Sequence, residues 1–174
     1  SLTAWDLGMG DPTAIWVAQV VGKEIRLLDC VENHGQALDW YVNWLRDNKY
    51  EGFTHILPHD VQVRELGTGK SRKEVLEEAG LSITVAPRLS VADGIQAVRR
   101  LLPRCWFHPR TKQGLDALRN YRREHDEKRA IFYEKPLHDW SSHFADGFRY
   151  LAIGLDEGDS SWQTTLPIST KWIV

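Results

Sequence analysis

The chain has 174 residues, 42% of them hydrophobic and 26% charged, which is the size and composition of one globular domain with a substantial core. With only two cysteines, Cys30 and Cys105, a secreted disulfide framework is excluded, and no stretch approaches the roughly 20 apolar residues needed to span a bilayer. The net charge of −2 combines nine acidic and four basic side chains over residues 1–60 with ten basic and four acidic over 99–129, so a polyanionic partner is not excluded.

The first sixty residues predict a three-strand meander, a helix and a fourth strand. Four apolar segments have the composition of strands: 2–7, 13–21, 24–31 and 54–57. The first three are joined by Gly8–Pro12 and Gly22–Lys23, which are turn residues, so they should form an antiparallel meander. Helical spacing of apolar residues follows over 36–47. A strand, a helix and a strand make a right-handed crossover, so the fourth strand should lie parallel to the first.

Helices and strands alternate in the rest of the chain. Helical patterns cover 71–79, 91–102, 111–123 and 140–153. Strand patterns cover 82–86, 105–107 and 130–133. The last helix is the clearest, because Trp140, Phe144, Phe148 and Leu151 form one apolar stripe. No internal repeat is visible.

This order of elements is that of a ribonuclease H-like α/β fold. We expect one mixed central sheet, built from the three-strand antiparallel meander plus parallel strands and flanked by helices. The domain should span residues 1–154. The regular pattern dissolves after Gly154, and residues 155–174 are expected to form a C-terminal tail.

Three aspartates are candidates for a common site. Asp6 lies within an apolar strand, where an unpaired buried charge is costly and calls for a function or a structural partner. Asp60 follows the end of the fourth strand, next to the end of the first if the two strands are parallel neighbours. Asp146 lies on the last helix, on a face about a quarter-turn or more from the apolar stripe, with His143 one turn away.

Converging carboxylates predict a divalent metal. They repel one another and require a counter-charge, which hard cations such as Mg²⁺ or Mn²⁺ supply through oxygen ligands. Two ions about 4 Å apart stabilise both the attacking and the leaving oxygen of a phosphoryl transfer. We therefore predict a metal-dependent hydrolase with Asp6, Asp60 and Asp146 as catalytic residues and metal ligands. Asp11 and His143 are candidates for groups around those ligands.

Each of these residues also has an ordinary structural interpretation. Asp60 before a loop is typical of a turn, and Asp146 of a solvated helix face. Asp139 is interpreted as the N-cap of the last helix rather than as a ligand. The basic residues of the 99–129 stretch that are candidates for DNA binding are Arg119, Arg122, Arg123 and Lys128, although a solvated helix face explains that stretch equally well.

Two nucleotide-binding motifs are incomplete. The segment Gly67-Thr-Gly-Lys-Ser71 resembles the end of a P-loop, but Arg64 stands where the first glycine belongs. Asp6-Leu-Gly with Thr13 is similar to the phosphate loop of actin-like ATPases and sugar kinases. The second phosphate loop and the adenosine loop of those proteins are not found.

Several segments carry a resemblance to a known family. They are Asp6-Leu-Gly with Asp11-Pro-Thr, Leu57-Pro-His-Asp60 with Gly67-Thr-Gly-Lys-Ser-Arg72, Trp106-Phe107, and Lys135-Pro-Leu-His-Asp-Trp-Ser-Ser-His143 with Ala145-Asp-Gly-Phe-Arg-Tyr150. They span nearly all of residues 1–154. With them the chain resembles the C-terminal nuclease domain of the large terminase subunit of tailed bacteriophages.

The resemblance implies an endonuclease that cleaves double-stranded viral DNA during genome packaging, with two Mg²⁺ or Mn²⁺ ions on Asp6, Asp60 and Asp146. It implies an N-terminal ATPase domain, absent from this sequence, as a partner, and contacts with the portal or the small terminase subunit. The expected location is the host cytoplasm. Two alternatives stay open: an actin-like ATPase or sugar-kinase-type fragment, and a non-catalytic packaging or docking module on the same fold.

Overall fold

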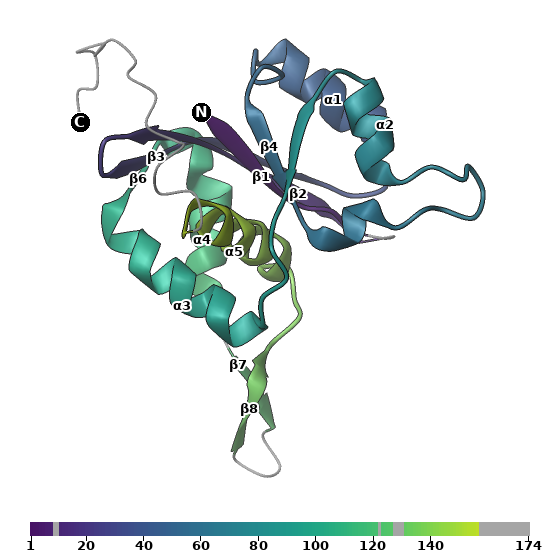
Figure 1. The fold of residues 1–174 in the computed structure, drawn as a ribbon. Helices are drawn as coiled ribbons and strands as arrows, with labels where there is room; N and C mark the ends of the chain where they lie inside the picture. The colour runs from purple at the N-terminus through teal and green to yellow at the C-terminus, as the bar shows by residue number, and fades with distance from the viewer. Residues whose placement is uncertain (9–10, 122, 127–130, 157–174) are drawn as a thin grey trace.

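A computed structural model describes residues 1–8, 11–121, 123–126 and 131–156, without the side chains of 123–126 and 131–135 (Figure 1). The strands of the main sheet are β1 Leu2–Asp6, β2 Thr13–Val21, β3 Glu24–Asn33, β4 Thr54–Leu57, β5 Ser82–Val85 and β6 Cys105–Phe107. The α-helices are α1 Leu38–Asp47, α2 Arg72–Glu78, α3 Val91–Leu101, α4 Lys112–Asn120 and α5 Ser142–Asp156. Short 3₁₀ turns are η1 His59–Gln62, η2 Leu102–Arg104 and η3 Pro109–Thr111.

The main sheet is mixed and has the strand order β5-β4-β1-β2-β3-β6. β1, β2 and β3 are antiparallel neighbours, which confirms the predicted meander. β4 lies parallel to β1, as the crossover rule predicts, and β5 is parallel to β4. β6 adds a parallel strand beside β3 at the other edge. The α/β, ribonuclease H-like prediction is confirmed.

Helices cover both faces of this sheet (Figure 1). Period-two alternation in β1 and β2 sends Trp5 and Ile15 to the face covered by α1 and α2, and Ala4 and Trp16 to the face covered by α3, α4 and α5. Each face therefore has its own core. The core under α5 is closed by Phe144, Phe148 and Leu151 of the predicted stripe, all essentially inaccessible to solvent.

Glycine allows α5 to lie close to the centre of the sheet. A Cβ at Gly147 would stand 3.4 Å from the backbone nitrogen of Asp6 and 3.3 Å from Cδ1 of Trp16, tighter than side chains usually pack. Trp16 in turn donates its indole N–H to the carbonyl of Phe144 at 2.8 Å. These contacts fix the first turns of α5 against the end of β1.

The segment that resembles a P-loop ending leads into α2 and ends at the N-cap of that helix. The Ser71 hydroxyl accepts the backbone N–H of Glu74, and the Glu74 carboxylate accepts the backbone N–H of Ser71, which together make a capping box. The backbone of Gly69 has a positive φ of 68°. The glycines and serine of this segment therefore serve a turn and a helix cap.

Two predicted helix boundaries are wrong. The helix predicted over 111–123 ends at Asn120, because Arg123–Asp126 forms strand β7, which pairs antiparallel with β8, Ile131–Pro136 (Figure 1). Pairing within the β7–β8 hairpin overrides the helical pattern. Trp140 precedes α5 and is 58% exposed, so it does not belong to the buried stripe.

The carboxyl-terminal helix continues past the predicted domain boundary. α5 runs to Asp156, so the first two residues assigned to the tail belong to its last turn. Residues 157–174 lie outside the described residues. Over the parts of the chain that the structure describes, none of the helices combines the length and the apolar character needed to cross a membrane.

Candidate active site

Asp6 is the last residue of β1, so it lies at the carboxyl end of a central strand. Helix α5 packs against this strand. The register partner of Asp6 on β2 is Ala14, and the Asp6 side chain points to the same face as the side chain of Ala4. Its Oδ2 lies 3.2 Å from Nδ1 of His143, on the first turn of α5. The carboxylate is thus half-buried between strand and helix and has a partner that is cationic when protonated.

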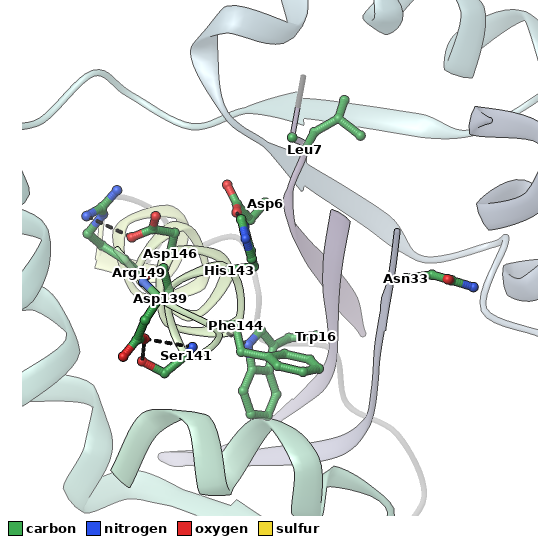
Figure 2. A network of polar contacts seen from close by, with 12 residues as sticks. Asp6, Leu7, Trp16, Asn33, Asp139, Ser141, His143, Phe144, Asp146 and Arg149 are labelled. Carbon is green, nitrogen blue, oxygen red and sulfur yellow. Dashed lines mark hydrogen bonds and ion pairs between the residues drawn. The ribbon is translucent and has the colours of Figure 1, made fainter. Parts of the chain in front are cut away.

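Asp146 lies one turn after His143 on α5 and is electrostatically coupled to both His143 and Asp6. Figure 2 shows Asp6 on the strand facing His143 and Asp146 on the helix. Oδ1 of Asp146 lies 3.1 Å from Nη1 of Arg149, whose side chain crosses α3 at Gly94. A Cβ at position 94 would collide with the Arg149 side chain, so glycine makes room for this ion pair.

Burial and mutual repulsion shape the ionisation of this site. Burial raises the pKa of Asp146, and so does the nearby Asp6, while Arg149 and His143 act in the opposite direction. The hydrogen bond to Asp6 raises the pKa of His143. Carboxylates that resist ionisation without a counter-charge are typical of sites that function with a bound cation.

Asp60 is positioned less tightly. It lies in η1 immediately after β4, at the same end of the sheet as Asp6, because β1 and β4 are parallel neighbours. Its side chain is exposed and makes no hydrogen bond or ion pair within the described part of the chain. A shared location of Asp60 with Asp6 and Asp146 remains a prediction. Asp11, an exposed residue after the β1 strand end, is near enough to raise the pKa of His143 slightly.

A further carboxylate near Asp6, that of Glu32 on β3, is missing from the sequence-based prediction. One of its oxygens, Oε2, is buried and has no hydrogen-bond partner among the described residues. Burial raises the pKa of Glu32, His143 lowers it and Asp6 raises it. Glu32 is therefore electrostatically coupled to Asp6 and His143. Its sequence context, Val-Glu-Asn, is that of a strand end, which offers no signal by itself.

The other candidates are distributed differently. Asp139 accepts the backbone N–H and the hydroxyl of Ser141, so it caps the turn that leads into α5. Arg119 is exposed and lies 3.8 Å from Asp116 on the same helix. Arg122 and Lys128 lie outside the described residues. Arg123 is in β7, where its side chain is not described.

The possible metal ligands around Asp6 fit a hard divalent cation. They are carboxylates, which Mg²⁺ and Mn²⁺ prefer, and one of their buried oxygens lacks a partner. Among the described residues, no three His, Cys, Asp or Glu side chains are gathered closely enough to hold an ion. Carboxylates repel one another until a cation neutralises them, and here Asp6 and Asp146 are turned to His143 and Arg149 instead.

The Asp6–His143 pair predicts a pH dependence for the metal-free protein. The folded-state pKa of His143 is raised above 6.5, so the stability that this pair contributes is fully present below about pH 6.5 and is lost as the pH rises through the raised pKa. In EDTA, an NMR titration of the His143 ring should give a higher pKa in the wild type than in Asp6→Asn. Equal values in the two proteins would contradict the pairing.

Comparison with solved structures identifies the fold. The chain superposes on the large terminase of the thermophilic bacteriophage D6E with a TM-score of 0.66 and 17% identity, over 88% of this chain and 39% of that one. For the g2p large terminase nuclease domain of bacteriophage SPP1 with bound Mn, the TM-score is 0.63 and the identity 20%, over 88% and 85% of the two chains. For the P22 large terminase nuclease domain they are 0.65 and 19%, over 89% and 80%.

These likenesses establish a shared fold. The chain spans well under half of the length of the D6E protein and most of the length of the two isolated nuclease domains. No family model and no curated protein matches the sequence. The chain thus has the fold of large terminase nuclease domains, at a sequence identity of 20% or less.

Proposed function

We propose that the chain is a divalent-metal-dependent endonuclease domain of a phage large terminase, which hydrolyses double-stranded viral DNA during genome packaging. The observation that carries this proposal is the contact of Asp6 with His143, one turn from Asp146, to which Asp6 is electrostatically coupled. The two carboxylates are separated by 139 intervening residues, yet both lie near the end of the central strand β1 of a ribonuclease H-like sheet. The fold shared with terminase nuclease domains, one of them with bound Mn, supports it.

Asp6, Asp60 and Asp146 would hold two Mg²⁺ or Mn²⁺ ions. Such ions, when bound, lower the pKa of the attacking water and stabilise charge on the attacking and leaving oxygens of the phosphodiester. His143 orients the Asp6 carboxylate through Nδ1. Arg149 pairs with the Asp146 carboxylate and balances its charge when no cation is bound.

The wider biological context belongs to the same proposal. The chain would act together with an N-terminal ATPase domain, as part of a protein of the length of the D6E terminase. It would function in the host cytoplasm, with the portal or the small terminase subunit as further partners. Residues 157–174, which follow α5 in the sequence, would be available for such contacts.

A basic track is the proposed route of the DNA. If Arg119, Arg122, Arg123 and Lys128 contact phosphates, affinity for duplex DNA falls steeply with salt because counterions are released. Replacing all four with glutamine should reduce the slope of log K against log salt by about 0.9 for each phosphate that is no longer neutralised, without changing sequence preference. Fluorescence anisotropy across a salt series measures the slope. Lys23→Gln, in the β2–β3 turn, is the control, and a quadruple variant with the control's slope would contradict the track.

Cleavage of supercoiled plasmid by the purified chain tests the proposed function. Incubation with Mg²⁺, Mn²⁺ or Ca²⁺, without any nucleotide, should give nicked and linear DNA with Mg²⁺ and with Mn²⁺. Mn²⁺ should be at least as effective as Mg²⁺, because it binds such sites more tightly, whereas Ca²⁺ should support little cleavage because it is larger and looser in geometry. EDTA and the Asp146→Asn variant are the controls. Cleavage that persists in EDTA, or that strictly requires ATP, would refute the mechanism.

A further inference from the structure

A row of three residues crosses the central strands at the candidate site. Asp6 on β1 is paired with Ala14 on β2, and Ala14 is paired with Glu32 on β3. Residues directly opposite one another in a sheet point to the same face, so Asp6 and Glu32 both point toward α5. Their Cα atoms are two strand spacings apart, roughly 10 Å. Ala14, whose side chain is only a methyl group, lies between them in this row.

A β-bulge brings Glu32 to this face. In the β2–β3 ladder, Ala18 is paired with Leu27 and Val17 with Asp29, so Leu28 is an extra residue without a partner. Ile25 and Leu27 pack in the core under α5. Simple alternation from them would send Glu32 to the opposite face. The bulge reverses the alternation, so a charged residue is turned toward the site at the point where the strand reaches it.

The charges at the site do not balance without a further cation. Asp6 has His143 at 3.2 Å, and Asp146 has Arg149 at 3.1 Å. Glu32 has no ion pair among the described residues, and its Oε2 is buried without a hydrogen-bond donor. Such an oxygen is costly unless a cation, a proton or a water molecule compensates it. A cation resolves the cost and also relieves the repulsion between Glu32 and Asp6.

We propose that Glu32 is an additional carboxylate ligand of the divalent-ion site, opposite Asp6 across Ala14. This inference rests on the proposed function, because it assumes that the site binds a divalent ion. It makes the ligand set asymmetric: Asp6 and Glu32 come from the rigid central strands, whereas Asp146 comes from α5 and Asp60 from a 3₁₀ turn. A purely structural Glu32, compensated by a proton or a water molecule, would leave metal affinity unchanged.

Direct measurement of Mn²⁺ binding tests the inference without relying on catalysis. The metal-free chain is titrated with Mn²⁺, and the EPR signal of the free ion gives the affinity. Even partners outside the ligand shell typically contribute 10–100-fold to metal affinity, so Glu32→Gln should weaken binding by about tenfold or more. Glu24→Gln, at the exposed start of the same strand, is the matched control and should bind as the wild type does. Asp6→Asn is the reference for loss of a ligand.

Thermal unfolding in EDTA accompanies the titration and shows that each variant is folded. Glu32→Gln should unfold at the wild-type temperature or above it, because a partly buried charge near Asp6 is removed. Addition of Mn²⁺ should raise its unfolding temperature less than that of the wild type. If Glu32→Gln does not fold, Glu32→Asp replaces it in the titration, since it keeps the charge but withdraws the carboxylate by one methylene. It too should bind Mn²⁺ more weakly.

The outcomes separate this inference from the proposed function. Wild-type Mn²⁺ affinity in Glu32→Gln, or in Glu32→Asp where that variant is the one measured, together with weak binding by Asp6→Asn, would overturn the role of Glu32 and leave the proposed function standing. A wild-type chain that binds no Mn²⁺ at millimolar concentration would overturn both. Weakened binding in the Glu32 and Asp6 variants, with an unchanged Glu24→Gln, would support both.

Discussion

Asp6→Asn is expected to lower the rate of plasmid cleavage at saturating Mn²⁺ by about 100-fold or more while the fold is retained. The substitution keeps the size of the side chain but removes a charged oxygen ligand. Loss of a partner outside the ligand shell alone costs 10–100-fold in affinity or activity, and loss of a ligand should cost no less. In EDTA the variant should lose the ion pair with His143 and gain relief from repulsion by Glu32, so its stability should change little.

The same assay separates the three predicted ligands. Asp146→Asn should be as inactive as Asp6→Asn, and Asp47→Asn, on the exposed end of α1, is the matched control that should cleave at the wild-type rate. Asp60→Asn is the most informative variant, because Asp60 has no partner among the described residues that would hold it in place. Wild-type cleavage by any of the three variants at saturating metal would remove that residue from the ligand set.

Trp16→Ala is expected to destabilise the protein by about 3–5 kcal/mol, the range for loss of a buried aromatic side chain. Trp16 is fully buried, its ring contacts those of Phe107, Phe144 and Phe148, and its N–H donates to the carbonyl of Phe144. The α4 backbone also rests directly on the ring at Gly114, where a Cβ would collide with it, so removal of the ring takes away a contact of that helix as well.

Urea unfolding of the metal-free chain measures this effect. Trp106→Ala is the matched control, since Trp106 is also a strand residue but is 64% exposed, and it should change the free energy of unfolding by less than about 1 kcal/mol. Because Trp16 holds the first turns of α5 against β1, Trp16→Ala should also weaken Mn²⁺ binding, whereas Trp106→Ala should not. Similar destabilisation by the two substitutions would contradict the proposed role of Trp16.

Local patterns in the sequence determined most of the fold. Period-two apolar runs with turn residues between them define β1, β2 and β3, and the crossover rule places β4 beside β1. The spacing of Phe144, Phe148 and Leu151 orients α5, so Asp146 and His143 can be assigned to the helix face beside Asp6. These features are predictable because each depends on neighbours within one element or on a handedness that few chains violate.

The tertiary structure alone decided the features that depend on how one element packs against or pairs with another. The β7–β8 hairpin replaces the end of a predicted helix, because strand pairing outweighs a weak local preference. Trp140 satisfies the helical spacing but precedes the helix and is exposed. Glu32 is the clearest case. Alternation along β3 turns it away from the site, and only the extra residue in its pairing with β2 turns it back. A bulge is set by the register between two strands, and that register has no signature in either strand alone.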